Sequence, residues 1–239
     1  MKFIPHLITS GNLFFGILAL VFLGGGQLIP ASYCIFIAGI LDFFDGFAAR
    51  LLKVAGDFGK QLDSLADVVT FGVVPGMMLF QISKQLIAWP FGQSAPMVVV
   101  YFPLLIGVFS ALRLAKFNID TRQTSSFLGL PTPANGFWIA SIPFLIEANP
   151  AWVQDAWITP YSLAVLALVS CILLVSELPL LSLKFKSWGF KTNWAAYLLL
   201  IGMGISLIVF KFAGLLALVP LYILVSVIDN QLKKNEIPG

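Results

Sequence analysis

Charged residues are scarce in this chain. Its 239 residues are 10% charged and 59% hydrophobic, with a mean hydropathy of +0.95, whereas soluble domains average about 25% charged residues. This composition excludes an ordinary soluble domain, and no nucleic-acid partner is expected. It predicts an all-α membrane protein, a polytopic helical bundle that forms a single domain over residues 1–239.

Histidine and cysteine are scarce as well. The chain has one histidine, His6, and two cysteines, Cys34 and Cys171, both within apolar runs. This excludes a disulfide framework and a Cys/His metal site, and His6 is expected to be an interfacial polar residue. No signal-peptide cleavage site follows the first apolar run, which is expected to be a permanent span. The lack of organelle-targeting features favours a prokaryotic cytoplasmic membrane.

Eight apolar runs are candidates for membrane spans, because a helix needs about 20 residues to cross the hydrocarbon core. The fifth is short, and the last two nearly adjoin at Lys211, so six or seven full crossings also fit. With the N-terminus in the cytoplasm, all 14 basic residues except Lys84 and Lys211 fall on the inner side, as the positive-inside rule requires. The eight predicted spans, with both termini cytoplasmic, are 6–25, 29–52, 61–82, 96–115, 133–149, 159–179, 193–210 and 212–230.

Four carboxylates lie at the inner ends of the second and third predicted spans. Asp42 and Asp45 are spaced i, i+3 on one helix face, and Gly59, Asp63 and Asp67 form one stripe at i, i+4, i+8 on the next. A tight hairpin near residues 54–57 would bring both faces together. Another acidic residue, Asp57, lies on neither stripe and is expected to cap a helix.

Four neighbouring carboxylates repel one another, and burying them without partners costs several kcal/mol each. Arg50 alone cannot neutralise four. Two divalent cations can, since Mg²⁺ and Mn²⁺ favour carboxylate oxygens and Ca²⁺ also accepts them. Gly46, Ala49 and Gly59 leave room for a ligand, and Arg50 offers a fork of donors to phosphate. The bland alternative is a set of surface charges that pair with lysines at the helix ends.

The eight residues of this pattern resemble the motif of the CDP-alcohol phosphotransferase family. The motif reads Asp-x₂-Asp-Gly-x₂-Ala-Arg-x₈-Gly-x₃-Asp-x₃-Asp, and all of its fixed positions match between residues 42 and 67. The resemblance implies a six-helix membrane core, usually a homodimer, in which an alcohol hydroxyl attacks a CDP-linked phosphate and releases CMP. It implies that Asp42, Asp45, Asp63 and Asp67 hold the metals, that Asp67 is the general base, and that Gly46, Ala49, Arg50 and Gly59 contact the CDP substrate.

Three further stretches resemble the phosphatidylserine synthases of this family. They are 5-PHLITSGNLFFG-16, 109-FSALRLAKFN-118 and 127-FLGLPTPANG-136. In the first, Asn12 is expected to contact the CDP substrate. Thr9 either contacts that substrate as well or is only part of an ordinary helix start. In the second, Lys116 replaces an arginine of the family pattern, so that no bidentate contact is expected there.

The resemblance implies CDP-diacylglycerol and L-serine as substrates, with membrane lipids around an active site on the cytoplasmic side. A zwitterionic amino acid needs a cation for its carboxylate, and Arg113 is the first candidate. Asn118 would orient the ammonium group or the loop. Two alternatives remain: another acceptor alcohol, such as glycerol phosphate or inositol phosphate, and a divalent-cation transporter, whose carboxylates would line a pore near the bilayer midplane.

Overall fold

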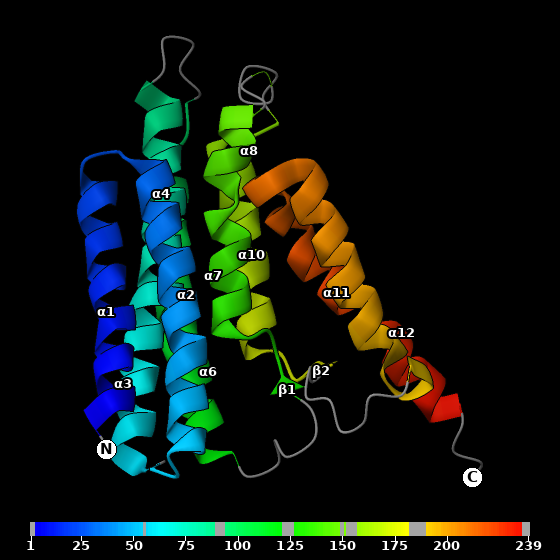
Figure 1. Ribbon diagram of the computed structural model, residues 1–239. Coiled ribbons are helices and arrows are strands. Elements are labelled where there is room, and N and C mark those ends of the chain that lie inside the picture. The colour runs from blue at the N-terminus through cyan, green and yellow to red at the C-terminus, as the bar shows by residue number, and fades with distance from the viewer. Residues whose placement is uncertain are drawn as a thin grey trace.

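The computed structural model describes residues 3–54, 56–88, 94–120, 127–148, 151, 157–181 and 190–235, except for the side chains of 127–128, 190–193 and 233–235. Long helices stand side by side, and α11 and α12 form a tilted pair at one edge of the bundle (Figure 1). The elements are α1 (Phe3–Gly24), α2 (Leu28–Leu51), α3 (Asp57–Asp67), η1 (Val68–Val73), α4 (Val74–Ala88), α5 (Met97–Tyr101), η2 (Phe102–Leu104), α6 (Leu105–Ile119), β1 (Phe127–Leu128), α7 (Thr132–Ala140), α8 (Ile142–Ala148), α10 (Pro160–Val175), β2 (Pro179–Leu180), α11 (Phe190–Phe210), η3 (Lys211–Ala217) and α12 (Leu218–Asn235).

The predicted helical membrane bundle is confirmed. Within the described residues, five helical stretches are long and apolar enough to cross a membrane. The predicted count of eight spans stays a prediction, because α7 and α8 meet at a turn at Ser141 and α10 has only 16 residues. The predicted seventh and eighth spans lie in one apolar stretch whose chain reverses direction at η3, so that α11 and α12 run side by side (Figure 1). The five stretches are Phe3–Gly24, Leu28–Leu51, Asp57–Ala88, Met97–Ile119 and Trp194–Leu232.

The bundle is apolar inside and outside, as expected where lipid replaces water. Ala19 of α1, Ile35 of α2 and Met78 of α4 are fully buried in one core cluster. Phe14 and Ile208 are large apolar side chains on the outer surface, exposed by 60% and 84%. Such side chains suit a protein surface that faces hydrocarbon.

One continuous helical rod links α3, η1 and α4, and its middle segment is a π-helix. The rod begins at Asp57, four residues before the third predicted span. Gly72 lies in the π-helical segment, and a Cβ there would lie 2.7 Å from Cβ of Ser110 and 3.5 Å from Cα of Gly107. The missing side chain therefore allows α6 to approach the rod closely, one turn beyond Asp67.

A small two-stranded antiparallel sheet, β1–β2, lies at the end of the bundle where α6 ends and α7 begins (Figure 1). Gly129 has φ +75°, and a Cβ there would lie 2.7 Å from the carbonyl oxygen of Ser176. Tyr222 Oη of α12 donates to the Leu181 carbonyl at 2.7 Å. Lys116 of α6 forms an ion pair with Glu177 at 2.9 Å. These contacts fix the segments that flank β1 and β2 against α10, α12 and α6.

Candidate active site

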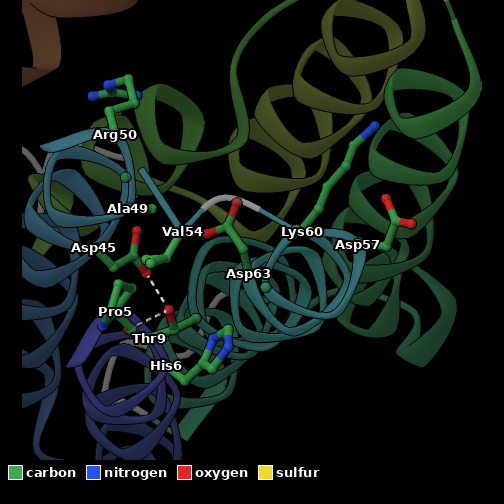
Figure 2. A pocket seen from close by; sticks show the side chains of 13 residues that line it. Pro5, His6, Thr9, Asp45, Ala49, Arg50, Val54, Asp57, Lys60 and Asp63 are labelled. Atoms are coloured by element: carbon green, nitrogen blue, oxygen red, sulfur yellow. Dashed lines mark hydrogen bonds between the residues drawn. The ribbon is translucent and has the colours of Figure 1, made fainter. Parts of the chain in front are cut away.

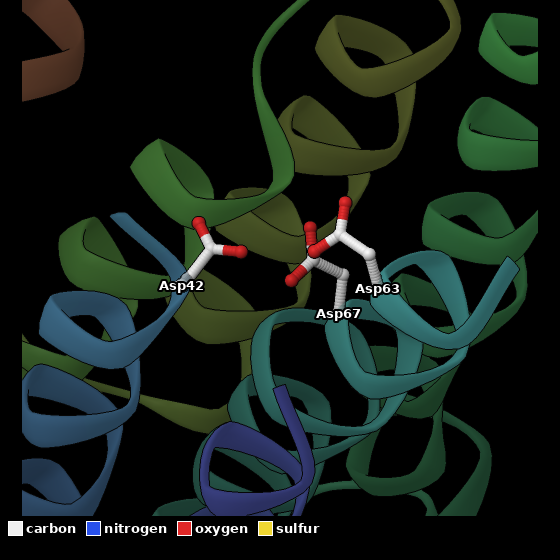
Figure 3. Close-up of side chains that lie close together, drawn as sticks. All are labelled: Asp42, Asp63 and Asp67. Atoms are coloured by element: carbon white, nitrogen blue, oxygen red, sulfur yellow. The ribbon is translucent and has the colours of Figure 1, made fainter. Parts of the chain in front are cut away.

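Three carboxylates converge between α2 and α3. Figure 3 shows Asp42 on α2 facing Asp63 and Asp67 on α3. One oxygen from each lies within 4.8 Å of the others. The i, i+4 spacing of Asp63 and Asp67 places both on one face of α3, and the sharp link after α2 directs that face to Asp42. The structure therefore brings together three of the four aspartates of the motif.

Asp45, the fourth aspartate of the motif, lies outside this cluster. It is buried and accepts a hydrogen bond from Thr9 Oγ1 of α1, with 2.6 Å between Oγ1 and Oδ2. The same hydroxyl lies 3.0 Å from the Pro5 carbonyl oxygen within α1. Thr9 thus binds a carboxylate of the motif and fixes α1 against α2.

Asn12 lies one turn further along α1 and is fully buried. Its Nδ2 donates to Asp67 Oδ1 at 3.4 Å, and its backbone carbonyl accepts from Thr70 Oγ1 at 3.3 Å. Gly16 follows on the same face, where a Cβ would collide with Thr70. The stripe of Thr9, Asn12 and Gly16 is therefore the surface of α1 that packs against the carboxylate helices and orients Asp67.

The carboxylate cluster forms no ion pair with a basic side chain among the described residues. No lysine or arginine there lies within 4.0 Å of any of the four aspartates, since the ion pair found is Lys116–Glu177. Asp63 Oδ1 is buried and accepts no hydrogen bond from any described residue. Buried carboxylates without partners are strongly disfavoured, and hard divalent cations bind such oxygens. The donor set therefore fits a metal ion held by Asp42, Asp63 and Asp67.

A cavity of about 540 Å³ opens beside the cluster, between the ends of α1, α2 and α3 (Figure 2). This volume is in the range of small-molecule sites, ~300–1,000 Å³. Gly46, Ala49, Arg50 and Gly59 all line it, together with Asp45 and Asp63. A Cβ at Gly46 would meet only the Arg50 side chain, at 3.4 Å. The structure thus places the small residues and Arg50 around one space.

His6 is a cavity residue that sequence reasoning assigned only to the interface. It lines the cavity, and a Cβ at Gly59 would lie 3.1 Å from its Cε1. Its ring also contacts Phe58 edge to face, with 5.1 Å between centroids. Asp57, in the first turn of α3, lies at the same cavity but outside the carboxylate cluster. The i, i+3 spacing of His6 and Thr9, which places them on one helix face, was the sequence signal that could have assigned His6 to the cavity.

Arg113 is buried in α6, with 8% of its surface exposed, and its Nε has no hydrogen-bond partner. Its guanidinium lies 5.9 Å from the ring centre of Phe117, and the charge of Asp67 acts on it. Asn118 has a different environment: its Nδ2 donates to Ser64 Oγ at 2.8 Å, and its carbonyl accepts from Lys60 Nζ at 2.9 Å. Arg113 is therefore a buried cation within reach of the charge of Asp67, while Asn118 links α6 to α3.

Sequence reasoning assigned no role to several buried polar residues near this site. Ser110 of α6 and Thr132 and Asn135 of α7 are all fully buried. Their side-chain hydroxyl and amide atoms have no hydrogen-bond partner among the residues that the structure describes. The i, i+3 spacing of Thr132 and Asn135 within an apolar stretch was the signal that could have found them.

Comparisons with known proteins show what the chain is similar to. A family model described as CDP-alcohol phosphatidyltransferase matches residues 2–228. The chain is 37% identical over 144 residues to the CDP-diacylglycerol–serine O-phosphatidyltransferase of Bacillus subtilis, an alignment that covers 60% of this chain and 77% of that one. It is 32% identical over 207 residues to the enzyme of the same name from Mycobacterium tuberculosis (83% of this chain, 67% of that one). It is 31% identical over 163 residues to the archaetidylserine synthase of Methanothermobacter thermautotrophicus (64% of each).

Proposed function

Because the chain belongs to the CDP-alcohol phosphatidyltransferase family, we propose that it transfers the phosphatidyl group of CDP-diacylglycerol to the hydroxyl of L-serine and releases CMP. The observation that carries this proposal is the convergence of the motif carboxylates beside a cavity, with a buried arginine near Asp67. The names of the bacterial and archaeal relatives support serine as the acceptor.

Asp67 is the proposed general base. Its contact with Asn12 Nδ2 orients the carboxylate, and its proximity to Asp63, which lines the cavity, supports a position near the proposed phosphate site. The serine hydroxyl oxygen attacks the phosphorus that carries diacylglycerol, its proton passes to Asp67, and the bond from phosphorus to the CMP oxygen breaks. A positioned base is needed because a hydroxyl is a weak nucleophile. Direct attack inverts the configuration at phosphorus.

Asp42, Asp63 and Asp67 would hold the divalent cations, with Asp45 beside them on α2. Two Mg²⁺ or Mn²⁺ ions, when bound, would offset the charge of the diphosphate and of the departing CMP. The Thr9 hydroxyl keeps Asp45 directed toward α1. We therefore propose that Asp45 acts either on a second ion or through its hold on α1.

The nucleotide diphosphate would occupy the cavity lined by Gly46, Ala49, Arg50 and Gly59. The glycines and the alanine let the ligand approach the backbone, and the exposed Arg50 can fold over phosphate oxygens as a fork of donors. Thr9 and Asn12 would act mainly by orienting Asp45 and Asp67. This refines their expected part in binding CDP-diacylglycerol.

Arg113 would bind the carboxylate of serine, since it is a buried cation with no acidic side chain within 4.0 Å among the described residues. Asn118 would position α3 through its hydrogen bond to Ser64. Of its two expected roles, this contact favours the orientation of protein segments rather than binding of the serine ammonium group. We further propose that the protein is a homodimer in a prokaryotic cytoplasmic membrane, with this site on the cytoplasmic side.

The test is CMP release by the purified protein with CDP-diacylglycerol, with and without serine. Wild type should release CMP and form phosphatidylserine only when serine is present, and Asp67→Asn should lose most of this activity. A parallel series with glycerol 3-phosphate and inositol phosphate identifies the acceptor. CMP release independent of serine, or full activity of Asp67→Asn, would contradict the acceptor or the base.

A further inference from the structure

A group of buried polar side chains on α6 and α7 lacks hydrogen-bond partners. Ser110 Oγ, Arg113 Nε, Thr132 Oγ1 and both amide atoms of Asn135 are buried and have no hydrogen-bond partner in the part of the chain that the structure describes. More than about 90% of buried polar groups in proteins are paired, and an unpaired one costs ~1–3 kcal/mol. Several such residues on two adjacent helices indicate a place where a polar ligand completes the hydrogen bonding.

These residues surround the rod that carries Asp67. A Cβ at Gly72 would lie 2.7 Å from Cβ of Ser110, and a Cβ at Gly136 would lie 2.8 Å from Phe71 Cδ1 and 3.3 Å from its Cα. Because Phe71 and Gly72 are neighbours in η1, α6 and α7 pack against the same turn of the rod. Asn135, adjacent to Gly136, belongs to this level of the bundle.

One turn closer to the carboxylate end of the bundle lie Asp67, Thr132 and Arg113. The rod and α7 run in the same direction and α6 runs opposite to them (Figure 1). One helical turn, about 5.4 Å, therefore leads from Phe71 to Asp67, from Gly136 to Thr132 and from Ser110 to Arg113. The charge of Asp67 indeed acts on Arg113. Thr132 and Asn135 share a face of α7, so this face lies beside the proposed base.

The chemistry of this group matches a zwitterion. Arg113 supplies a buried positive charge for an anionic group. The Asn135 amide offers both an acceptor and a donor, and the Thr132 hydroxyl offers the same pair. A phosphorylated alcohol would bring two negative charges to this one cation, since Lys60 and Lys116 already bind the Asn118 carbonyl and Glu177.

We propose that Thr132 and Asn135 line the acceptor pocket, where Asn135 and Thr132 bind the α-ammonium of an amino acid whose α-carboxylate binds Arg113. This inference rests on the proposed function, because the pocket adjoins Asp67 as the base. It adds two specificity-determining residues on α7 to the arginine on α6. It also explains why hydrogen-bonding atoms on these helices have no protein partner.

The experiment measures the KM for serine and for CDP-diacylglycerol in Thr132→Val and Asn135→Leu, which replace polar atoms by apolar ones of similar size. The KM for serine should rise by roughly 10-fold to 100-fold, the factor for losing a hydrogen bond to a charged group, with the KM for CDP-diacylglycerol changed less than about 3-fold. Thr132→Ser should recover most of the affinity. The matched control is Ser83→Ala, a fully buried hydroxyl further along α4 that donates to the Leu79 carbonyl.

An unchanged KM for serine in both variants, with wild-type activity intact, would overturn the inference and leave the proposed function standing. If Asn135→Leu does not fold, the KM for serine in Thr132→Val and Thr132→Ser decides whether the inference holds. If wild type forms no phosphatidylserine and binds no radiolabelled serine at equilibrium, the proposed function itself fails. If wild type instead accepts another hydroxy amino acid, and both variants lose affinity for it, the pocket stands and only the named acceptor changes.

Discussion

At the scale of single residues, the four aspartates of the motif have two different environments. Asp42, Asp63 and Asp67 lie close together and form no ion pair with a basic side chain among the described residues. Asp45 is bound by the Thr9 hydroxyl. The identical residue types in the motif therefore do not imply identical roles, and the hydrogen bond to Thr9 distinguishes Asp45 from the rest.

Asp63→Asn should weaken the binding of Mn²⁺ by ~10–100-fold or more. Mutation of a residue that only hydrogen-bonds to a metal ligand already lowers metal affinity by that factor. The reason is that Asp63 contributes a buried, unpaired oxygen to the cluster. Electron paramagnetic resonance of Mn²⁺ added to the metal-free protein measures this without an activity assay. Asp57→Asn is the control, because Asp57 lies outside the cluster. Equal Mn²⁺ affinity in the two variants would exclude Asp63 as a ligand.

At the scale of elements, the π-helical segment η1 follows Asp67 directly and packs against both α6 and α7. A π-helical segment within an α-helix changes the direction of the residues on either side, and such segments are frequent at functional sites. Here the segment lies between α3, which carries Asp63 and Asp67, and the largely apolar α4. The close approach at Gly72 sets the distance between Asp67 and the polar residues of α6.

Gly72→Ala should lower the free energy of unfolding by ~1–3 kcal/mol, the cost of overpacking a close contact, and should raise the KM for serine. A Cβ there would lie 2.7 Å from Cβ of Ser110, so α6 must shift away and carry Arg113 with it. Thermal unfolding in detergent and the serine titration measure the two effects. Gly204→Ala in α11 is the matched control, because a Cβ added there would meet no atom of the described residues within 4 Å outside its own helical backbone. A Gly72 variant as stable as this control would refute the close packing.

At the scale of the whole molecule, the carboxylate site lies at one end of the bundle. The cavity is formed by the N-terminal end of α1, the C-terminal end of α2 and the start of α3, and these ends lie together in Figure 1. A site at one end of the bundle suits one substrate from water and one from the membrane. It does not resemble a transport site halfway along a pore, in keeping with the family to which the chain belongs.

Cysteine labelling tests the orientation of the molecule. In a background with Cys34→Ser and Cys171→Ser, Lys53→Cys should react with an impermeant maleimide only after the cells are opened. Lys84→Cys, near the opposite end of the bundle, should react in intact spheroplasts. Both positions are exposed, while both native cysteines are buried. The reverse labelling pattern would contradict the predicted cytoplasmic side of the active site.

The sequence by itself determined the class of fold, the membrane location and the motif residues, because hydropathy and helical spacing are local properties of the chain. Asp63 and Asp67 share one face because their spacing matches the period of a helix, whichever helix lies opposite. Only the tertiary structure decided that Asp45 turns to Thr9, that η1 is a π-helix, and that Thr132 and Asn135 lie buried without partners. These features depend on which helix faces each side chain, and that choice is made by the packing of elements far apart in the sequence.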